Sequence, residues 1–241
     1  MSINQDEEQE ALTGSYIAPL DIEGTNEILK QMQNSVCQIY VDENRKGTGF
    51  FCYINHENSK IPIMMTNNHV MDEDYIKKKG YIILSINNGK YIRRIKIDEN
   101  RFYYSSQKYD TTIIELFPRK DNIKNFLELE DNIMDENSHF CYNNESVYLM
   151  HYPINKKLSV SYGILKIIEE SEIKHFCYTD YGSSGSPILS ITNKKIIGIH
   201  KEGRERFKFK TGTFLKYPIN EFLENIKKYF FCRKVFRHSK L

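Results

Sequence analysis

Cysteine is scarce in this chain of 241 residues, and its spacing excludes several kinds of site. The five cysteines are scattered and odd in number, and no C-x-x-C pair occurs. A zinc site or a disulfide framework would need closer or paired cysteines, so we expect free thiols, a reducing compartment and no metal. The cysteines are Cys37, Cys52, Cys141, Cys177 and Cys232.

Long hydrophobic runs and a hydrophobic leader are also missing. The N-terminal stretch MSINQDEEQEALTG has neither a basic region nor an apolar region, so it does not resemble a secretory signal. The longest apolar runs are far shorter than the roughly 20 residues that cross a bilayer as a helix. We therefore expect a cytoplasmic protein without stable membrane insertion, although export by another route stays open.

An excess of one charge is absent as well. Lys and Arg number 34 against 32 Asp and Glu, which gives a net charge of +2 and no reason to expect a nucleic-acid partner. Hydrophobic residues make up 40% of the chain and charged residues 27%, which favours a folded domain with a sizeable core over global disorder. No sequence feature indicates an oligomeric state.

Short runs rich in β-branched and aromatic residues make up most of the chain. About a dozen of them recur at intervals of roughly ten residues with turns between them, which is typical of a β-sandwich or β-barrel protein. The polar stretch 118–145 interrupts the series and predicts a connection between two β-halves, at about 35–118 and 140–217. The clearest runs are SVCQIYV, GTGFFCYI, IPIMMT, SVYLMHY, SPILSI and KTGTFLKY.

Helices are expected only near the two ends. Residues 1–24 are acidic and aperiodic, and we interpret them as a mobile arm. The segment 25–34, TNEILKQMQN, predicts a short helix capped by Thr25 or Asn26. The segment 218–232, PINEFLENIKKYFFC, predicts a closing helix that begins at a proline.

The stretch YGSSGSPIL at 181–189 combines glycine and serine in a way that calls for a special loop. A G-x-S-x-G elbow places its serine between a strand and a helix, but Ser186 follows Gly185 directly and breaks that pattern. Pro187 before an apolar run indicates the start of a strand instead of a helix. The same failure, and the absence of alternating strands and helices, disfavour an esterase of the α/β-hydrolase type.

The alternative is the loop of a β-barrel serine protease, which has a glycine two residues before the serine and another directly after it. Gly182, Ser184 and Gly185 fit that spacing. Glycine freedom would let the backbone amides of Gly182 and Ser184 face one point, where a substrate oxyanion forms. An ordinary tight turn is the other interpretation of the loop taken alone.

Two polar residues at strand ends supply the partners that a serine nucleophile needs. His69 follows the apolar run IPIMMT, and Asp110 precedes the run TTIIEL. Singly, each is more typical of a structural histidine or a capping aspartate. The order His69, Asp110, Ser184 is that of the chymotrypsin arrangement. It allows histidine and aspartate in the first β-half and serine in the second, with the site in the cleft between them.

Taken together, six motifs resemble those of trypsin-like serine proteases, most closely the bacterial glutamyl endopeptidases and HtrA-like enzymes. The resemblance implies an all-β fold of two six-stranded antiparallel barrels over 25–241, which hydrolyses peptide bonds of a protein or peptide substrate without a cofactor. The motifs, in the family's order, are GTGFF at 47–51, TNNHV at 66–70, YDTTIIEL at 109–116, HYP with SYGILK at 151–153 and 161–166, GSSGSP at 182–187, and IIGIHKEG at 196–203.

In such an enzyme Ser184 would attack the scissile carbonyl, His69 would accept its proton, and Asp110 would orient the imidazole. The backbone amides of Gly182 and Ser184 would form the oxyanion hole. A protease fold that binds peptides without cleaving them is the alternative, and the intact set of His69, Asp110 and Ser184 argues against it.

Two residues depart from the family pattern. His151 stands where a small residue is more common, and Ser183 stands where an asparagine or aspartate usually precedes the nucleophile. In digestive members that aspartate pairs with a newly cut N-terminal amine and switches the oxyanion loop on. Because Ser183 has no carboxylate, we expect no such switch, and activity without cleavage of the arm at 1–24.

The specificity pocket is less fully defined by the sequence. Thr179 and His200 match positions that contact an acidic P1 side chain in glutamyl endopeptidases, where a hydroxyl and an imidazolium could bind a carboxylate. Lys201 would add positive charge. We expect the pocket walls to be the backbone from Lys201 to Gly203, with Gly212 opposite. A strand threonine and a barrel histidine without this role are the alternative.

Overall fold

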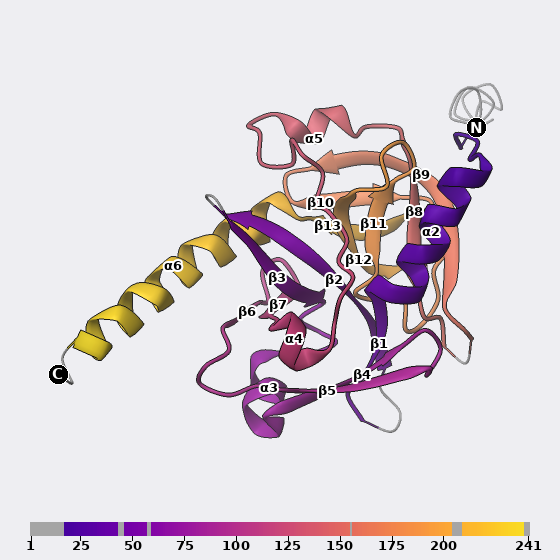
Figure 1. The fold of residues 1–241 in the computed structure, drawn as a ribbon. Helices are drawn as coiled ribbons and strands as arrows, with labels where there is room; N and C mark the ends of the chain where they lie inside the picture. Colours follow the sequence, from indigo (N-terminus) through magenta and orange to yellow (C-terminus); the bar gives the residue numbers. More distant parts are fainter. Residues whose placement is uncertain (1–16, 43–45, 57–58, 155, 204–208, 239–241) are drawn as a thin grey trace, which may run out of the picture.

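The computed structural model describes most of the chain, and its strands form two separate β-units (Figure 1). Residues 1–16 of the predicted acidic arm lie outside the described residues, so that prediction stays open. The structure describes residues 17–42, 46–56, 59–154, 156–203 and 209–238.

The first β-unit is a sheet of seven antiparallel strands in the order β5-β4-β1-β2-β3-β7-β6. That is one strand more than the six expected. The additional strand is β6, whose four residues are too few to show an alternating pattern in the sequence. The strands are β1 Val36–Tyr40, β2 Lys46–His56, β3 Ser59–Thr66, β4 Tyr81–Ile86, β5 Tyr91–Lys96, β6 Tyr103–Ser106 and β7 Thr111–Glu115.

The second β-unit is a closed barrel of six antiparallel strands in the order β10-β13-β12-β11-β8-β9, as expected. Closure of the sheet leaves no unpaired strand edge. Its strands are β8 Glu145–His151, β9 Ser159–Glu169, β10 Glu172–His175, β11 Pro187–Ser190, β12 Ile196–Gly203 and β13 Lys210–Phe214.

The N-terminal helix α2, Ile22–Ser35, begins earlier than the sequence suggested. Its N-cap is Asp21, whose Oδ1 accepts a hydrogen bond of 2.7 Å from the amide of Gly24, so the expected caps Thr25 and Asn26 lie inside the helix. The cap satisfies an amide that has no partner within the helix. Part of the predicted arm is therefore helical.

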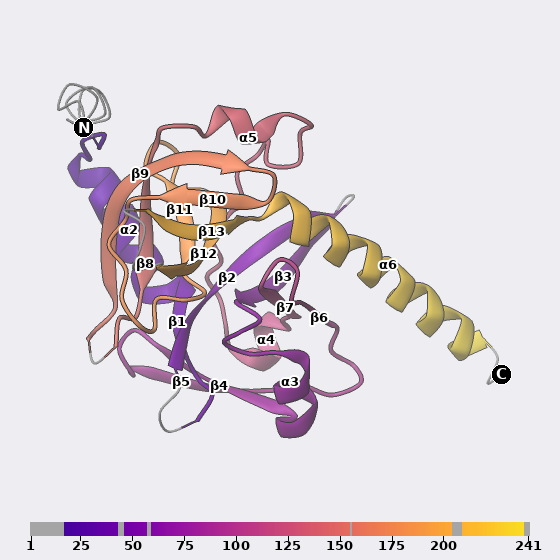
Figure 2. The same ribbon diagram turned by 180° about the vertical axis from the view of Figure 1, so that it is seen from behind.

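The C-terminal helix α6, Lys216–His238, extends the predicted segment at both ends and connects the two β-units. It leaves the barrel directly after β13 and passes beside β6 of the first sheet, as the two opposite views show (Figure 1, Figure 2). The ring of Phe222 lies 5.5 Å from that of Phe102, and the hydroxyl of Tyr104 donates a hydrogen bond of 2.7 Å to Glu221. Helix α6 thus fastens the first sheet to the barrel. None of the helices in the described residues is both long and apolar enough to cross a membrane.

The polar stretch between the β-units is tied to both of them. It contains the short helices α4 Pro118–Asp121 and α5 Ser138–Cys141. Between these helices, the amide of Leu127 donates to Phe51 on β2, and the amide of Glu130 donates to Ile196 on β12. A further short helix, α3 Glu73–Lys79, follows β3 in the first β-unit.

Strand β2 is buried on both faces and contributes to two hydrophobic cores. Successive side chains of a strand point to opposite faces, so Phe50 and Phe51 belong to different clusters. Phe50 packs in the larger cluster, which also contains Leu149 and Ile199 of the barrel. This shared core holds the two β-units against each other and fixes the position of the loops at their junction.

Candidate active site

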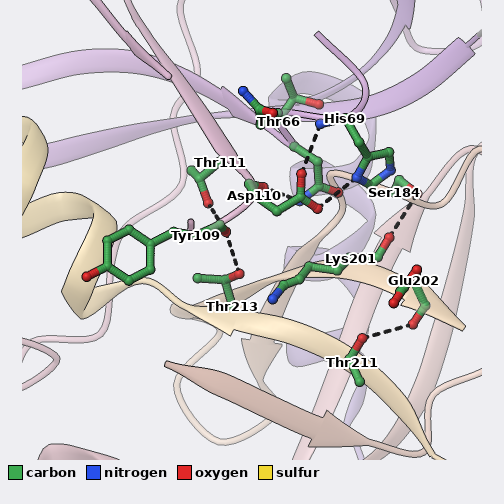
Figure 3. Close-up of polar contacts among 12 residues, drawn as sticks. Thr66, His69, Tyr109, Asp110, Thr111, Ser184, Lys201, Glu202, Thr211 and Thr213 are labelled. Carbon is green, nitrogen blue, oxygen red and sulfur yellow. Dashed lines mark hydrogen bonds and ion pairs between the residues drawn. The ribbon is translucent and has the colours of Figure 1, made fainter. Parts of the chain in front are cut away.

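His69 and Asp110 lie in two loops of the first β-unit and contact each other (Figure 3). Asp110 Oδ2 is 2.7 Å from His69 Nδ1, and Asp110 Oδ1 accepts a hydrogen bond of 2.9 Å from the backbone amide of His69. Because an ionised carboxylate only accepts hydrogen bonds, Nδ1 carries the proton in this pair. The neutral ring then presents Nε2 as a proton acceptor.

The backbone around Asp110 is shaped to make this contact. Asp110 has a φ of 48°, in the left-handed region that aspartate tolerates better than most residues. Its carbonyl accepts a hydrogen bond of 2.8 Å from the side chain of Asn67, which lies two residues before His69. The carboxylate side chain is 20% exposed and the imidazole 48%, so the carboxylate is sheltered while the ring stays open to a substrate.

Ser184 comes from the second β-unit, and Figure 3 shows it beside the ring of His69. Its hydroxyl donates a hydrogen bond of 2.9 Å to the carbonyl of Lys201. No hydrogen bond joins Ser184 to His69 in the described part of the chain. Rotation of the Ser184 side chain about its Cα–Cβ bond would move the hydroxyl between staggered positions. Active sites without substrate often have long or broken contacts of this kind.

The loop that carries Ser184, residues 182–186, is called the serine loop. Thr48, in the motif GTGFF on β2, binds this loop to the first β-unit. Its amide donates to the carbonyl of Ser184 at 2.9 Å, and its hydroxyl donates to the carbonyl of Gly182 at 2.8 Å. The hydroxyl oxygen also accepts a hydrogen bond of 3.0 Å from the amide of Tyr152. The sequence identified the motif but not this role, because the contact depends on how the two β-units meet.

The two glycines of the loop are required by close contacts. Gly185 has a φ of +88°, and a Cβ atom there would lie 2.0 Å from the carbonyl oxygen of Thr48. Gly182 has a φ of +84°, and a Cβ atom there would lie 2.6 Å from the carbonyl oxygen of Tyr152. Only glycine combines this backbone conformation with so little space.

The amides of Gly182 and Ser184 donate no hydrogen bond to any residue that the structure describes. In contrast, the amides of Ser183 and Gly185 donate to Asp180 and His200, at 3.0 Å each. Most backbone amides in proteins are paired. These two amides, which have no hydrogen-bond partner in the described residues, are the ones predicted from the sequence for the oxyanion hole. They are available to an acceptor from outside the chain.

A pocket lies beside Ser184, and it contains three of the five residues expected in the specificity site. Thr179, His200 and Gly203 line it together with Asp180, Tyr181, Ser184, Glu202 and Lys210.

The structure places the other two expected residues elsewhere. A Cβ atom on Gly212 would lie 2.7 Å from the carbonyl oxygen of Ile199 and 2.8 Å from Ile188 Cδ1, so this glycine faces the barrel interior and serves strand packing. The Lys201 side chain runs away from Ser184 in Figure 3, and its carbonyl is the group that contacts the hydroxyl. Neither Gly212 nor the Lys201 side chain belongs to the lining of the pocket.

His200 is buried and neutral, in contrast to the expected imidazolium. Burial lowers its pKa well below the usual value, and unfavourable electrostatic interactions with His175, His151 and Lys210 lower it further. His200 Nδ1 lies 3.1 Å from Nε2 of His175, whose Nδ1 accepts a hydrogen bond from the amide of Cys177. His175 therefore donates through Nε2, and burial lowers its pKa to about 3. His200 shapes the pocket without supplying a charge.

Lys210 is the cation of the pocket, and sequence reasoning missed it. It begins β13 and pairs with Gly203 on β12 and with His175 on β10. Its Nζ would lie 2.7 Å from a Cβ atom on Gly203, so its side chain crosses that glycine at the pocket wall. In the described residues, no carboxylate forms an ion pair with it. The pairing of β13 with β12 and β10 brings Lys210 to the pocket.

The described residues contain no cluster of three or more side chains suited to a metal ion. Cys37, Cys52 and Cys177 are buried free thiols and Cys141 is an exposed one. Burial raises the pKa values of the three buried thiols, which makes the thiolate form unfavourable there.

Comparisons with known proteins agree with this arrangement. The family model described as a trypsin-like peptidase domain matches residues 47–199. A serine endoprotease from Yersinia pestis has a similar structure, with a TM-score of 0.60 and 14% identity over 86% of this chain and 68% of that one. Deg5 is similar with a TM-score of 0.60 and 14% identity, over 83% of this chain and 94% of its own. No curated protein sequence gave a significant match. The structural likeness confirms the trypsin-like fold, and neither comparison singles out the glutamyl endopeptidases.

Proposed function

Since this chain belongs to the trypsin-like peptidase family and is a serine-type endopeptidase, we propose that His69, Asp110 and Ser184 carry out its chemistry on peptide bonds. The observation that carries the proposal is the contact of 2.7 Å between His69 and Asp110, with Ser184 presented beside the ring by the other β-unit. Each component comes from a different loop, and the packing of the two units brings them together.

In this mechanism the Ser184 hydroxyl leaves the carbonyl of Lys201 and gives its proton to His69 Nε2 as Oγ attacks the scissile carbonyl carbon. Asp110 stabilises the imidazolium that forms. The tetrahedral oxyanion accepts hydrogen bonds from the amides of Gly182 and Ser184. His69 then protonates the leaving amine, the C–N bond breaks, and an acyl ester on Ser184 remains. Water activated by His69 hydrolyses that ester and restores the free hydroxyl.

We further propose that the pocket selects an acidic P1 residue through Lys210 and Thr179. A substrate carboxylate would form a charge-assisted hydrogen bond with the ammonium and accept a second bond from the hydroxyl. Two carboxylates, those of Asp180 and Glu202, also line the pocket. That of Asp180 is already engaged: it accepts a bond of 2.8 Å from the amide of Tyr181 and lies 3.7 Å from Lys156. The neutral His200 leaves Lys210 as the source of positive charge.

A peptide-binding module without hydrolytic activity is the second candidate function. It is favoured by one observation, the hydrogen bond of the Ser184 hydroxyl to Lys201 in place of His69. If that bond persisted with substrate bound, the nucleophile would stay inactive.

Peptide hydrolysis by wild type and by Ser184→Ala separates the two candidates. We expect turnover in the wild type and a loss of about 10⁴- to 10⁶-fold in kcat in Ser184→Ala, since loss of the nucleophile removes the covalent route. The control is Ser159→Ala, a serine at the start of β9 whose hydroxyl bonds only to the carbonyl of Lys157 in the described structure, and it should keep wild-type turnover. Peptide binding without cleavage by the wild type would establish the binding module instead.

A panel of peptides that differ only at P1 tests the acidic pocket. We expect wild type to cleave after Glu and Asp in preference to Gln and Asn, and Lys210→Met to lose about 10- to 100-fold of that preference, as for a hydrogen bond to a charged group. Lys201→Met is the matched control, because its side chain lies outside the pocket, and it should keep the preference. Preference of the wild type for Arg, Leu or Ala at P1 would refute the acidic pocket while leaving the peptidase assignment intact.

A further inference from the structure

The two residues at which this chain departs from the family pattern contact each other. His151, at the end of β8, places Nδ1 2.7 Å from the Oγ of Ser183, the residue directly before the nucleophile. Both are buried, with 1% of His151 and none of Ser183 exposed. A histidine in place of a small residue and a serine in place of a carboxylate or amide are therefore one structural feature.

Each ring nitrogen of His151 has a serine hydroxyl as its hydrogen-bond partner. Ser183 Oγ accepts a bond of 3.1 Å from the amide of Asp180 and shares a second bond with His151 Nδ1. His151 Nε2 lies 2.7 Å from the hydroxyl oxygen of Ser161 on β9, so one ring nitrogen donates and the other accepts. The ring is neutral in this arrangement, and burial lowers its pKa to about 4, with Lys156 lowering it and Asp180 raising it. His200 interacts with this ring and is itself neutral.

Ser183 makes several of the hydrogen bonds that hold the serine loop. Its amide donates to the carbonyl of Asp180, and its carbonyl accepts hydrogen bonds from both the amide and the hydroxyl of Ser186. It separates Gly182 from Ser184, the two residues whose amides are uncommitted. Any rotation of Ser183 would therefore turn both proposed oxyanion donors.

The chain segment that follows His151 supports the same loop. The carbonyl oxygen of Tyr152 lies against Gly182, and the amide of Ile154 donates a hydrogen bond of 2.6 Å to the carbonyl of Tyr181. His151 thus lies at the end of β8, and the chain that follows it contacts the serine loop. In the described residues, no other titratable side chain forms a hydrogen bond with Ser183.

We propose that His151 is a positioning residue that holds the serine loop, through Ser183, in the conformation needed for catalysis. A neutral hydrogen bond from inside the barrel would take the place of the carboxylate and N-terminal amine that shape this loop in digestive relatives. Because the anchor is part of the folded domain, the loop needs no new N-terminus. The inference rests on the proposed peptidase function, since it assigns a role within the same site.

Two conservative variants of His151 separate positioning from simple packing. His151→Asn can place its side-chain amide near the position of Nδ1 and keep a hydrogen-bond partner for Ser183, whereas His151→Gln can reach Ser161 but not Ser183. We expect His151→Gln to lose about 10- to 100-fold in kcat, up to the effect of losing one oxyanion donor, with KM nearly unchanged. His151→Asn should stay within a few-fold of wild type.

Ser183→Ala removes the other partner of the same hydrogen bond. It tests the proposal even if a His151 variant fails to fold. It should lose as much kcat as His151→Gln, and the double variant should lose no more than either, because both remove one interaction. The rate of reaction with a fluorophosphonate, whose phosphoryl oxygen would occupy the oxyanion hole, should fall in parallel. Tyr148→Phe is the control: it removes a buried hydrogen bond of 2.6 Å to Gln31 from the same strand and should keep wild-type kcat.

Equal kcat values in wild type, His151→Gln and Ser183→Ala would overturn the inference and leave the peptidase function standing. So would losses that simply add in the double variant, or that appear equally in His151→Asn and His151→Gln. A wild-type protein that neither hydrolyses peptides nor reacts with the fluorophosphonate would instead overturn the proposed function, and this inference with it. An uncleavable N-terminal extension should leave wild-type kcat unchanged.

Discussion

At the scale of single residues, Asp110 contributes through its backbone and its side chain together. Its left-handed backbone turns the carboxylate toward the His69 ring, while its carbonyl is held by Asn67. In the proposed mechanism the carboxylate keeps the proton on Nδ1, which leaves Nε2 as the base for Ser184. This arrangement predicts that charge at position 110 matters more than shape.

Asp110→Asn tests that prediction. We expect kcat to fall by roughly 10⁴-fold near neutral pH, because an amide can donate to Nδ1 and favour the wrong tautomer, and because it cannot stabilise the imidazolium. The thermal midpoint should change little. Asp98→Asn is a matched control at an aspartate whose carboxylate contacts Lys96 at 3.5 Å and the amide of Asn100 at 3.1 Å, and its kcat should equal that of wild type. A loss of less than tenfold in Asp110→Asn would contradict the assigned role.

Some residues of the site can be identified from the sequence and others cannot. Ser184, His69 and Asp110 stand in local motifs, so the sequence singles them out as candidates. The neutral state of His200 does not, since its burial depends on neighbours contributed by several strands. Lys210 was missed for the same reason: it has no motif, and only the pairing of β13 with β12 brings it to the pocket. His151 was identified as unusual, but its contact with Ser183 required the fold.

At the scale of elements, a buried ion pair joins the segment before β6 to α4. Arg101 and Asp121 form two hydrogen bonds of 2.8 Å, and their side chains are 1% and 4% exposed. Arg101 also donates to the carbonyls of Lys96 and Glu115, and Asp121 accepts from the amide of Phe117. These buried hydrogen bonds join the two short segments to each other.

Asp121→Ala should therefore lower the free energy of unfolding by about 3–5 kcal/mol, because it leaves a buried, uncompensated guanidinium. Urea unfolding measures the change, with the slope m expected to stay constant. The exposed pair of Lys60 and Glu128, 3.5 Å apart, provides the comparison: Glu128→Ala should cost less than about 1 kcal/mol. Equal costs for the two variants would show that burial does not determine the strength of the Arg101 pair.

Most elements could be predicted from the sequence because their apolar runs alternate or repeat clearly. The exceptions are informative. Strand β6 has only four residues and is too short to show a pattern, although it pairs with β7 across a short turn. The start of α2 depends on the Asp21 cap, although Thr25 and Asn26 are equally good capping residues by type. The residue types of this segment therefore predict a helix, but they do not predict which capping residue begins it.

At the scale of the whole molecule, the position of Ser184 relative to His69 depends on how firmly the two β-units are held together, and helix α6 is one of the elements that join them. Phe222 is fully buried between the rings of Phe102 and Tyr104 of the first unit, and it belongs to the core that continues into the barrel. The chain order of the β-halves could be predicted, but the position of this helix across both could not, since it depends on tertiary packing alone.

Phe222→Ala should lower the free energy of unfolding by about 3–5 kcal/mol, as expected for an aromatic side chain removed from a core. Denaturant unfolding checks it, and unfolding in two separate steps would show that α6 couples the units. Phe230→Ala is the control on the same helix, because Phe230 is 42% exposed and its loss should change stability little. A wild-type midpoint in Phe222→Ala would contradict the role given to α6.

The most direct test of the central claim is the site and rate of fluorophosphonate modification, determined by mass spectrometry of the intact and digested protein. If Ser184 is a nucleophile activated by His69, the wild type should carry one adduct, on Ser184, and His69→Ala should form it at least about 10³-fold more slowly. An adduct on another serine, or equal rates in the wild type and His69→Ala, would contradict the account.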